Sequence, residues 1–206
     1  MPTIPSMILA FDTSSAACTA ALFDGSGECV ARRDELIGRG HSERLVPMIA
    51  ELLDGQTAEE IIVGVGPGSF TGIRVAIAAA QGLAIGWDAE LFGMSSLALL
   101  AAGAGTQAAA AMTGGHGELF VQQFSAAGEA EGELINAPPP AAAAATSAKL
   151  VVGSGARQLV DARGYGEARD ACPSAADALK LAESQRSLPP RPVYARAPDA
   201  RVKAAA

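Results

Sequence analysis

The residues most able to do chemistry stand in a glycine-rich loop between a strand-like run and a helix-like run. Residues 61–65 are apolar and lead into Gly66-Pro67-Gly68-Ser69-Phe70-Thr71-Gly72. So many glycines beside a proline indicate a backbone that needs unusual φ values or passes close to another group. The loop lacks the Gly-Lys-Ser/Thr ending of a P-loop and cannot supply its phosphate-binding lysine. We predict a structural turn with a positive φ at one glycine or more and a helix cap at Ser69 or Thr71, made of Gly66, Pro67, Gly68, Ser69, Thr71 and Gly72.

A second polar group follows the first apolar run of the chain. Asp12, Thr13 and Ser14 come directly after residues 7–11 and precede a hairpin-like segment. A carboxylate and two hydroxyls at a strand end can hold a phosphate or its magnesium. They can equally form an Asx turn that closes the hairpin. We take Asp12, Thr13 and Ser14 as a candidate nucleotide site and keep the turn as the alternative.

The sequence carries none of the other patterns that signal catalysis. Its two histidines, His41 and His116, are far apart, and there is no HExxH motif and no G-x-S-x-G nucleophile elbow. A cysteine in this setting is better explained as a small buried hydrophobe than as half of a Cys–His pair. His41 is best explained as a residue that hydrogen-bonds near a helix start. We therefore predict no catalytic residue and no metal site.

Composition narrows the classes of partner. The net charge of −7 argues against autonomous binding of nucleic acid through a basic surface. Three cysteines without a CxxC pair fit a reducing, cytoplasmic compartment. The start of the chain has no basic region typical of a signal peptide, and we find no apolar run of the roughly 18 residues that span a bilayer.

The elements that position these residues alternate between strands and helices. In the first half we expect strands at 7–11, 17–23, 28–33 and 61–65 and helices at 41–53 and 72–86. In the second half the pattern predicts helices at 93–102 and 175–183, strands at 108–112, 118–125 and 150–152, a surface connection at 136–145 and an extended tail at 189–201. Pro47 would kink the helix 41–53 or mark its start, and Ser42 could cap it. We find no internal repeat, and the order predicts a mixed α/β lobe.

The predicted helix at 72–86 is apolar nearly all round, with Arg74 and Gln81 as its only polar side chains. A helix without a polar stripe is buried on more than one side. It is therefore either a central core helix or part of an interface with another protein. We predict an interface shared with the helix 41–53 and formed by Leu45, Met48, Ile49, Leu52, Ile73, Ile77, Ala80 and Ala84.

Four segments together resemble the bacterial TsaB (YeaZ) family. They are Ile8-Leu9-Ala10-Phe11-Asp12-Thr13-Ser14, His41-Ser42-Glu43-Arg44-Leu45-Val46-Pro47-Met48-Ile49, the loop 66–74 and Gln81-Gly82-Leu83-Ala84. The segment Pro192-Val193-Tyr194-Ala195-Arg196 is also similar to that family's ending. The resemblance is strong over residues 7–100 and thin beyond them. Where members usually carry an Asp-Ala-Arg segment, this chain has Thr113-Gly114-Gly115.

The resemblance implies the actin-like ATPase fold of sugar kinases, heat-shock 70 proteins and actin, with a first lobe at 1–100 and a second lobe and tail at 101–206. It implies a non-catalytic dimerization subunit of the complex that makes N6-threonylcarbamoyladenosine at position 37 of tRNA. In that system the chain would pair with TsaD, which carries the metal and transfers the group, and the ATPase TsaE would join them. Free protein would form a homodimer, no cofactor would bind tightly, and ATP or ADP and tRNA would be bound only within the complex.

Two readings remain as alternatives. One is an independent kinase or ATPase of the same fold that uses Asp12 with Gly153 and Gly155. The other, weaker, is a peptidase. The second-lobe hairpin offers Thr113 and glycines but no acid to hold magnesium, which favours the accessory subunit.

Overall fold

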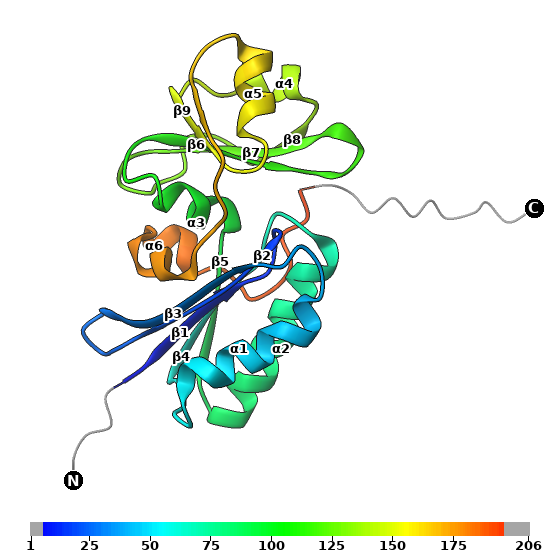
Figure 1. The fold of residues 1–206 in the computed structure, drawn as a ribbon. Helices are drawn as coiled ribbons and strands as arrows, with labels where there is room; N and C mark the ends of the chain where they lie inside the picture. The colour runs from blue at the N-terminus through cyan, green and yellow to red at the C-terminus, as the bar shows by residue number, and fades with distance from the viewer. Residues whose placement is uncertain (1–5, 196–206) are drawn as a thin grey trace, which may run out of the picture.

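Two five-stranded mixed sheets, one in each lobe, organise the chain (Figure 1). The computed structural model describes residues 6–195 of the 206. The first lobe contains, in chain order, β1 (Ile8–Asp12), β2 (Ala17–Phe23), β3 (Cys29–Leu36), α1 (His41–Leu53), β4 (Glu60–Gly64), α2 (Phe70–Trp87) and β5 (Glu90–Met94). After α3 (Ser96–Ala102), the second lobe contains β6 (Ala108–Thr113), the 3-10 turn η1 (Gly115–Gly117), β7 (Leu119–Phe124), β8 (Ile135–Ala137), α4 (Pro139–Ala144), β9 (Leu150–Val152), α5 (Ala156–Arg163) and β10 (Glu167–Arg169).

The two lobes have the same topology. The first sheet has the strand order β3-β2-β1-β4-β5 and the second has β10-β9-β6-β7-β8, which is the same order read from the opposite edge. In each lobe an antiparallel meander of three strands is followed by two strands parallel to its first strand. The sequence shows no repeat, yet the chain order β-β-β-α-β-α-β occurs twice. Corresponding turns of the two lobes can therefore be compared directly.

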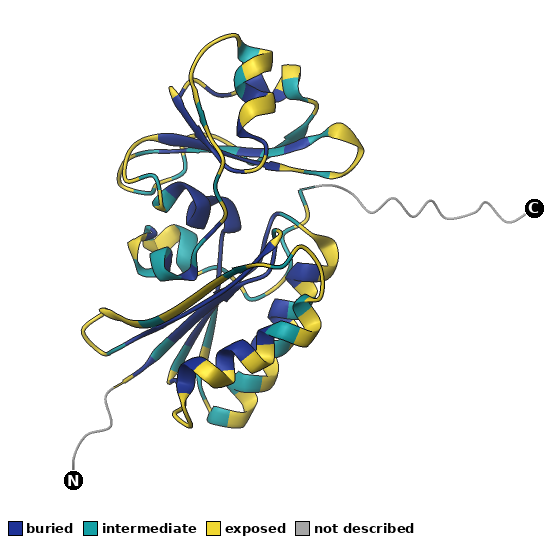
Figure 2. Ribbon diagram, in the orientation of Figure 1, coloured by how far each residue is buried: buried dark blue, intermediate teal, exposed yellow. Residues whose placement is uncertain are grey.

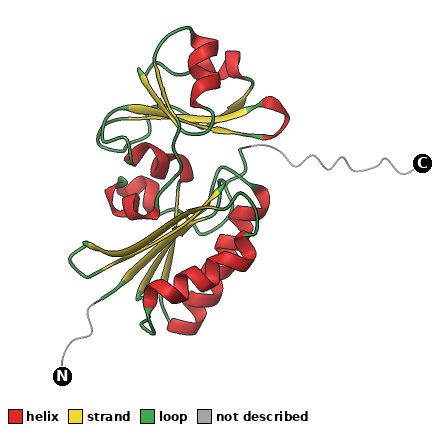
Figure 3. Cartoon of the chain, viewed as in Figure 1, coloured by secondary structure: helices red, strands yellow, loops and turns green. Residues whose placement is uncertain are grey.

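Successive side chains of a strand point to opposite faces of its sheet, and this divides the interior into separate layers. Leu9 and Phe11 of β1 pack with α1 and α2, whereas Ala10 between them faces the space between the sheets. That middle layer is filled by α3 and by the 3-10 helix η2 (Ala175–Lys180). On the far side of the second sheet, Ala109 and Ala111 pack with α4 and α5. Figures 2 and 3 show this stacking, with helices outside both sheets and between them.

The predicted helix 41–53 is confirmed as α1, and it runs through Pro47. Its N-cap is Gly40, in the left-handed region at φ 88°, and no side chain caps it, so the cap predicted at Ser42 is wrong. The Ser42 hydroxyl instead donates a hydrogen bond to Glu43. At the other end Asp54, also left-handed at φ 46°, closes the helix by donating from its backbone N–H to the Ala50 carbonyl.

The second half of the chain departs from the sequence prediction at several elements. Residues 136–145 are not a plain connection but contain the end of β8 and the helix α4, in which Pro139 takes the first position. Proline is suited to that position because its missing N–H has no helical partner there, and alanine is the best helix former. The expected helix 93–102 begins only at Ser96, after β5. The pattern missed β5, α5 and β10, and the expected helix 175–183 is the 3-10 helix η2 followed by α6 (Glu183–Arg186).

The C-terminal part of the chain returns to the first lobe, which corrects the predicted lobe boundary. Leu188 pairs with Gly93 of β5 through two backbone hydrogen bonds, and the Val193 N–H donates to the Val65 carbonyl. The second lobe therefore ends near β10, and residues 175–193 pack between the sheets or along β5. These returning contacts form because β5 is an edge strand with free backbone groups. Residues 196–201 of the predicted tail lie outside the described residues. So do residues 1–5, on which the signal-peptide prediction rests.

Helix α2 corrects the expectation that no segment is long enough to span a bilayer. Within residues 6–195 it is the one helix whose length and composition pass that test, with 18 residues and a mean hydropathy of 1.2. In the fold only 28% of it is buried, and the buried residues pack with the first sheet. The core helix of a protein outside the membrane passes the same test, so one such helix is weak evidence of a membrane span.

Candidate functional site

The glycine-rich loop forms the structural turn that the sequence predicts. The peptide bond between Gly66 and Pro67 is cis, and Gly66 and Gly68 have φ values of 101° and 156°. Ser69 caps α2 by accepting a hydrogen bond from the Gly72 N–H at 3.2 Å, so the predicted cap is confirmed at Ser69. The loop therefore sets the starting point and direction of α2.

Three glycines of this segment allow it to lie directly against the end of β1. A Cβ atom at Gly64 would come within 1.8 Å of the Asp12 carboxylate, and one at Gly68 within 2.2 Å of the Ser14 carbonyl oxygen. A Cβ at Gly72 would lie 1.9 Å from the Thr13 carbonyl oxygen. Real Cβ atoms essentially never come so close. The glycines are therefore required by close packing, against the Asp12 side chain at Gly64 and against backbone at Gly68 and Gly72.

The same packing occupies the three residues that we predicted as a nucleotide site. Asp12, Thr13 and Ser14 are buried, with 0%, 0% and 2% of their surface exposed. Oδ1 of Asp12 accepts hydrogen bonds from the backbone N–H and the hydroxyl of Ser14, both at 2.7 Å. The Thr13 hydroxyl donates to the Gly72 carbonyl at 2.7 Å. The Asx-turn alternative describes Asp12, whose carboxylate is satisfied internally, while Ser14 also lines the cavity between the lobes, so a nucleotide site at these residues stays a prediction.

The corresponding turn of the second lobe is arranged in the same way. The Thr113 N–H donates to the Ser154 hydroxyl at 3.1 Å, and the Gly155 N–H donates to the Ala111 carbonyl at 2.9 Å. A Cβ at Gly153 would lie 2.3 Å from the Ala111 carbonyl oxygen. Gly153 and Gly155 therefore serve close packing on β6, and the kinase-like reading that used them with Asp12 gains no support.

The residues predicted as a partner interface lie in the core of the first lobe, which corrects that prediction. All are at most 6% exposed except Ala84, which is half-buried, and they pack on β1, β2 and β4. The helical spacing of these residues was predicted correctly, but the most hydrophobic side of a helix packs against the sheet of its own chain. The residues that we predicted as an interface, and that the structure places against the first sheet instead, are Leu45, Met48, Ile49, Leu52, Ile73, Ile77, Ala80 and Ala84.

The opposite side of α2 is an apolar surface that remains open. Ala78, Gly82 and Ile85 are exposed, and Ile85 is 85% exposed. Val46 of α1 is 52% exposed and lines a groove of about 310 Å³ between α1 and α2, with Leu83 and Trp87 on the other wall. Figure 2 shows the sides of α1 and α2 that face away from the sheet as exposed. We call Val46, Ala78, Gly82, Leu83 and Ile85 the outer helix face; the i, i+4, i+7 spacing of 78, 82 and 85 is a signal that sequence reasoning could have used.

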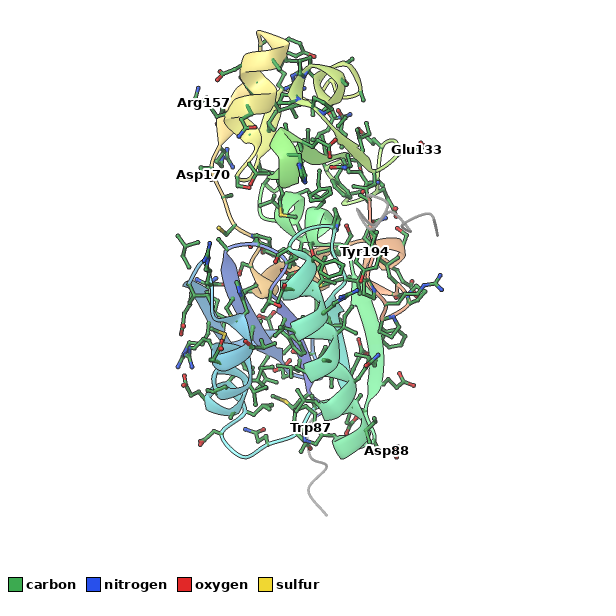
Figure 4. The ribbon with its side chains drawn as sticks, turned by 90° about the vertical axis from the view of Figure 1, so that its right-hand side faces the viewer. Trp87, Asp88, Glu133, Arg157, Asp170 and Tyr194 are labelled. Atoms are coloured by element: carbon green, nitrogen blue, oxygen red, sulfur yellow. The ribbon has the colours of Figure 1, made fainter. Side chains whose placement is uncertain are left out.

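An aromatic and cationic cluster caps the other end of α2. The Arg74 guanidinium lies 3.6 Å from the centre of the Phe70 ring, and its Nε donates to the Tyr194 hydroxyl at 3.1 Å. The rings of Phe70 and Tyr194 are 5.7 Å apart. Figure 4 shows Tyr194 at the level where the lobes meet and Trp87 at the far end of α2. The contact joins residues 120 positions apart, and no local pattern could reveal it.

Ionisable groups elsewhere in the first lobe have structural partners. The Arg44 guanidinium binds Glu35 at 2.6 Å and Glu51 at 2.8 Å, and these hydrogen bonds hold the pKa of both carboxyls below its ordinary value. The His41 ring nitrogen Nε2 lies 3.3 Å from the Ala17 carbonyl oxygen, in agreement with a hydrogen-bonding role. Over the described range 6–195 there is no group of three or more His, Cys, Asp or Glu side chains that could hold a metal ion.

Comparison with known proteins agrees with this geometry. The family model described as "TsaD: tRNA N6-adenosine threonylcarbamoyltransferase" matches residues 34–154. The tRNA threonylcarbamoyladenosine biosynthesis protein TsaB of Escherichia coli is 38% identical over 128 residues, which cover 57% of this chain and 54% of that protein. The match thus spans about half the length of that relative. The structure of YeaZ from Pseudomonas aeruginosa superposes with a TM-score of 0.77 at 31% identity and covers 92% of this chain and 99% of that one.

Two lobes of identical topology, with the first hairpin turn of each lobe facing the space between them, define a protein of the actin-like ATPase fold. The ethanolamine utilization protein EutJ from Carboxydothermus hydrogenoformans shares this fold at 14% identity, with a TM-score of 0.50 over 88% of this chain. Within that fold, the chain belongs to the TsaB (YeaZ) family.

Proposed function

We propose that this chain is a non-catalytic accessory subunit in the biosynthesis of threonylcarbamoyladenosine in tRNA and that it binds a TsaD-like enzyme through the outer helix face. The observation that carries the proposal is the exposed apolar side of α2, with Ile85 at 85% exposure. Burying one such side chain contributes roughly 1.5–3 kcal/mol. Because Ile85 lies with Val46, Ala78 and Gly82 on one open apolar face, we expect the partner to bind there.

The shape of the outer helix face suits contact with another helix. Ala78 and Gly82 lie between Arg74 and Ile85 on the exposed side of α2, and the space beyond Gly82 is open. Small residues let a partner helix approach closely, while the flanking Ile85 and Val46 supply apolar area. A second copy of this chain could use the same face, so a homodimer of free protein would be displaced by the enzyme.

The accessory role is supported by the burial and the hydrogen bonds of Asp12, the residue that we considered as a magnesium ligand. Asp12 is fully buried and its hydrogen bonds are made within the first lobe and to Ser96, so it is not positioned to hold magnesium. On this proposal ATP or ADP and tRNA are bound only by the complex with TsaD and TsaE, and the protein acts in the cytoplasm. A solved relative is described as similar to a peptidase, but within residues 6–195 we find no metal-binding cluster to support that chemistry here.

Reconstitution tests the proposal. Threonylcarbamoyl-adenylate, tRNA and the TsaD and TsaE proteins of the same organism are combined with and without this chain, and modified adenosine is measured by mass spectrometry of the digested tRNA. We expect rapid modification only with the chain present, and none with the chain alone. Equal yields in both reactions would refute the accessory role. ATP turnover or peptide cleavage by the isolated wild-type chain would favour the kinase-like or peptidase-like reading.

A further inference from the structure

One positive charge on the exposed side of α2 has no negative partner within the chain that the structure describes. Arg74 is the only charged residue of this 18-residue helix, in a chain whose net charge is −7. It is exposed, and within residues 6–195 it forms no ion pair. The helix dipole favours cations at the C-terminal end, and Arg74 lies nearer the N-terminal end. Neither the dipole nor a neighbouring carboxylate therefore explains this charge.

Two aromatic residues hold the Arg74 side chain in one position. The centre of the Phe70 ring lies 3.6 Å from the central carbon of the guanidinium, and Nε donates a hydrogen bond to the Tyr194 hydroxyl at 3.1 Å. We call Phe70, Arg74 and Tyr194 the arginine clamp. A side chain that is already ordered loses little conformational entropy when a partner binds it. The clamp therefore presents a cation that is prepared for contact.

The two remaining nitrogens of the guanidinium determine what the clamp can bind. Within residues 6–195, Nη1 and Nη2 of Arg74 donate no hydrogen bond. Their parallel N–H groups match the two oxygens of a carboxylate. Phe70 and Tyr194 are 55% and 45% exposed, so a partner would cover apolar ring surface as well. Arginine and aromatic residues are enriched in protein interfaces, and the clamp thus fits a carboxylate on another protein.

The arginine clamp continues the outer helix face toward the junction of the lobes. Arg74, Ala78, Gly82 and Ile85 are all exposed and follow one another at helical spacing, so they lie on one side of α2. Figure 4 shows Tyr194 where the lobes meet and Trp87 at the far end of the helix. A partner that lies along Ala78 and Gly82 therefore reaches Arg74 with one of its ends.

We propose that Arg74 forms an ion pair with an Asp or Glu side chain of the TsaD-like enzyme and that Phe70 and Tyr194 position it for this contact. The inference rests on the proposed function, because it places the contact within the same interface. Tyr194 belongs to the segment that returns from the second lobe to the first. That segment therefore takes part in partner binding, although it lies far from α2 in the sequence.

Isothermal titration calorimetry of the full chain with the TsaD-like enzyme of the same organism, without tRNA and at several salt concentrations, tests this inference. Arg74→Met keeps the apolar stem and removes the charge. We expect it to raise the Kd about tenfold or more and to make the Kd less dependent on salt. Tyr194→Phe keeps the ring and removes the hydroxyl, and it should raise the Kd about two- to fivefold.

Arg157→Met is the matched control, since it makes the same substitution at an exposed residue of α5. Figure 4 shows Arg157 in the second lobe, away from Tyr194, and this variant should bind as the wild type does. Circular dichroism of each variant separates a folding defect from a lost contact. A purely structural Arg74 would alter stability but would leave the salt dependence of the Kd unchanged.

A charge reversal identifies the group on the enzyme. Arg74→Glu should raise the Kd more than Arg74→Met does, because it places like charges together. Exposed Asp and Glu residues of the enzyme are then replaced by Lys one at a time. One of these substitutions should restore binding of Arg74→Glu, and the others should not.

Three results would overturn the inference. A wild-type chain that does not bind the enzyme would refute the proposed function together with this inference. Enzyme binding that is unchanged in Arg74→Met, with the wild-type salt dependence, would overturn this inference alone. If Arg74→Met bound the enzyme normally but the assembled complex lost tRNA, the cation would belong to an RNA phosphate and not to a protein carboxylate.

Discussion

The hydroxyl of Ser96 donates a 2.5 Å hydrogen bond to Oδ2 of Asp12, across 84 residues of sequence. Ser96 is the first residue of α3, and Asp12 is the last of β1. The same hydroxyl accepts a hydrogen bond from the Gly66 N–H at 3.2 Å, and the Ser96 N–H donates to the Gly66 carbonyl at 2.9 Å. The carboxylate therefore joins the strand, the glycine-rich loop and the helix that leads to the second lobe.

Removing the Ser96 hydroxyl should destabilise the protein. Ser96→Ala leaves one buried oxygen of Asp12 without its donor, and we expect a loss of about 1.5–3 kcal/mol in the free energy of unfolding, measured in urea. Ser184→Ala is the matched control, since Ser184 donates to the Glu129 carboxylate at 2.8 Å on the surface. Its loss should stay below about 0.5 kcal/mol. Equal effects of the two substitutions would contradict the structural role of Asp12.

Two glycines of α2 should respond to alanine in opposite directions. Gly72→Ala places a Cβ 1.9 Å from the Thr13 carbonyl oxygen and should destabilise by about 2 kcal/mol or more. Gly82→Ala meets no atom within 4 Å and should stabilise by about 0.5–1 kcal/mol. Urea denaturation of both variants measures the difference. If Gly72→Ala were neutral, the loop could not lie against β1 as described.

Charge on the outer helix face should prevent binding of the TsaD-like enzyme without unfolding the chain. Ile85→Glu and Gly82→Arg change exposed positions, so circular dichroism should match the wild type while the complex is lost from size-exclusion chromatography. Leu36→Glu, at a 76% exposed residue on β3, is the control and should leave the complex intact. Substitutions at Ile77 or Ala80 cannot serve this test, because both are core residues. A complex that survives Ile85→Glu and Gly82→Arg together would place the interface elsewhere.

The Arg44 ion pairs should make stability depend on pH in the acid range. Hydrogen bonds from Arg44 hold the pKa of Glu35 and of Glu51 below the ordinary value of 4.5 in the folded chain. A carboxyl with a lowered folded pKa stabilises the fold above its unfolded pKa, and that stability is lost as the pH falls through the folded pKa. Arg44→Met should therefore be less stable than wild type at about pH 7 and approach it at about pH 3. Arg157→Met, at an exposed position of α5, should show no such convergence.

The three thiols should differ in reactivity. Burial raises the pKa of the Cys18 thiol to about 11, and its sulfur lies 3.9 Å from that of Met48. Cys29 and Cys172 are exposed. We expect a thiol reagent such as DTNB to label two thiols in the native protein and the third only in denaturant. Rapid labelling of Cys18 in the folded chain would show that β2 is open to solvent.

The sequence by itself determined the local features of this protein. The glycine-rich turn, its cap at Ser69 and the bounds of α1 follow from backbone chemistry and helical spacing, which act within a few residues. The motifs also sufficed to indicate the family and the actin-like fold. Topology could be expected only in part: β6, β7 and β9 were predicted, but β8 and β10 have three residues each and are too short to give an alternating pattern.

The tertiary structure alone decided which groups remain available. Leu45 and Ile85 both lie at helical spacing on apolar stripes, but only packing on the sheet decides that Leu45 is buried and Ile85 is open. The sequence alone indicated that Asp12 binds phosphate or magnesium. In the fold, the hydroxyl of Ser96, 84 positions away, donates a hydrogen bond to its carboxylate. Burial and long-range hydrogen bonds depend on how distant segments meet, and that information is not contained in the spacing of neighbouring residues.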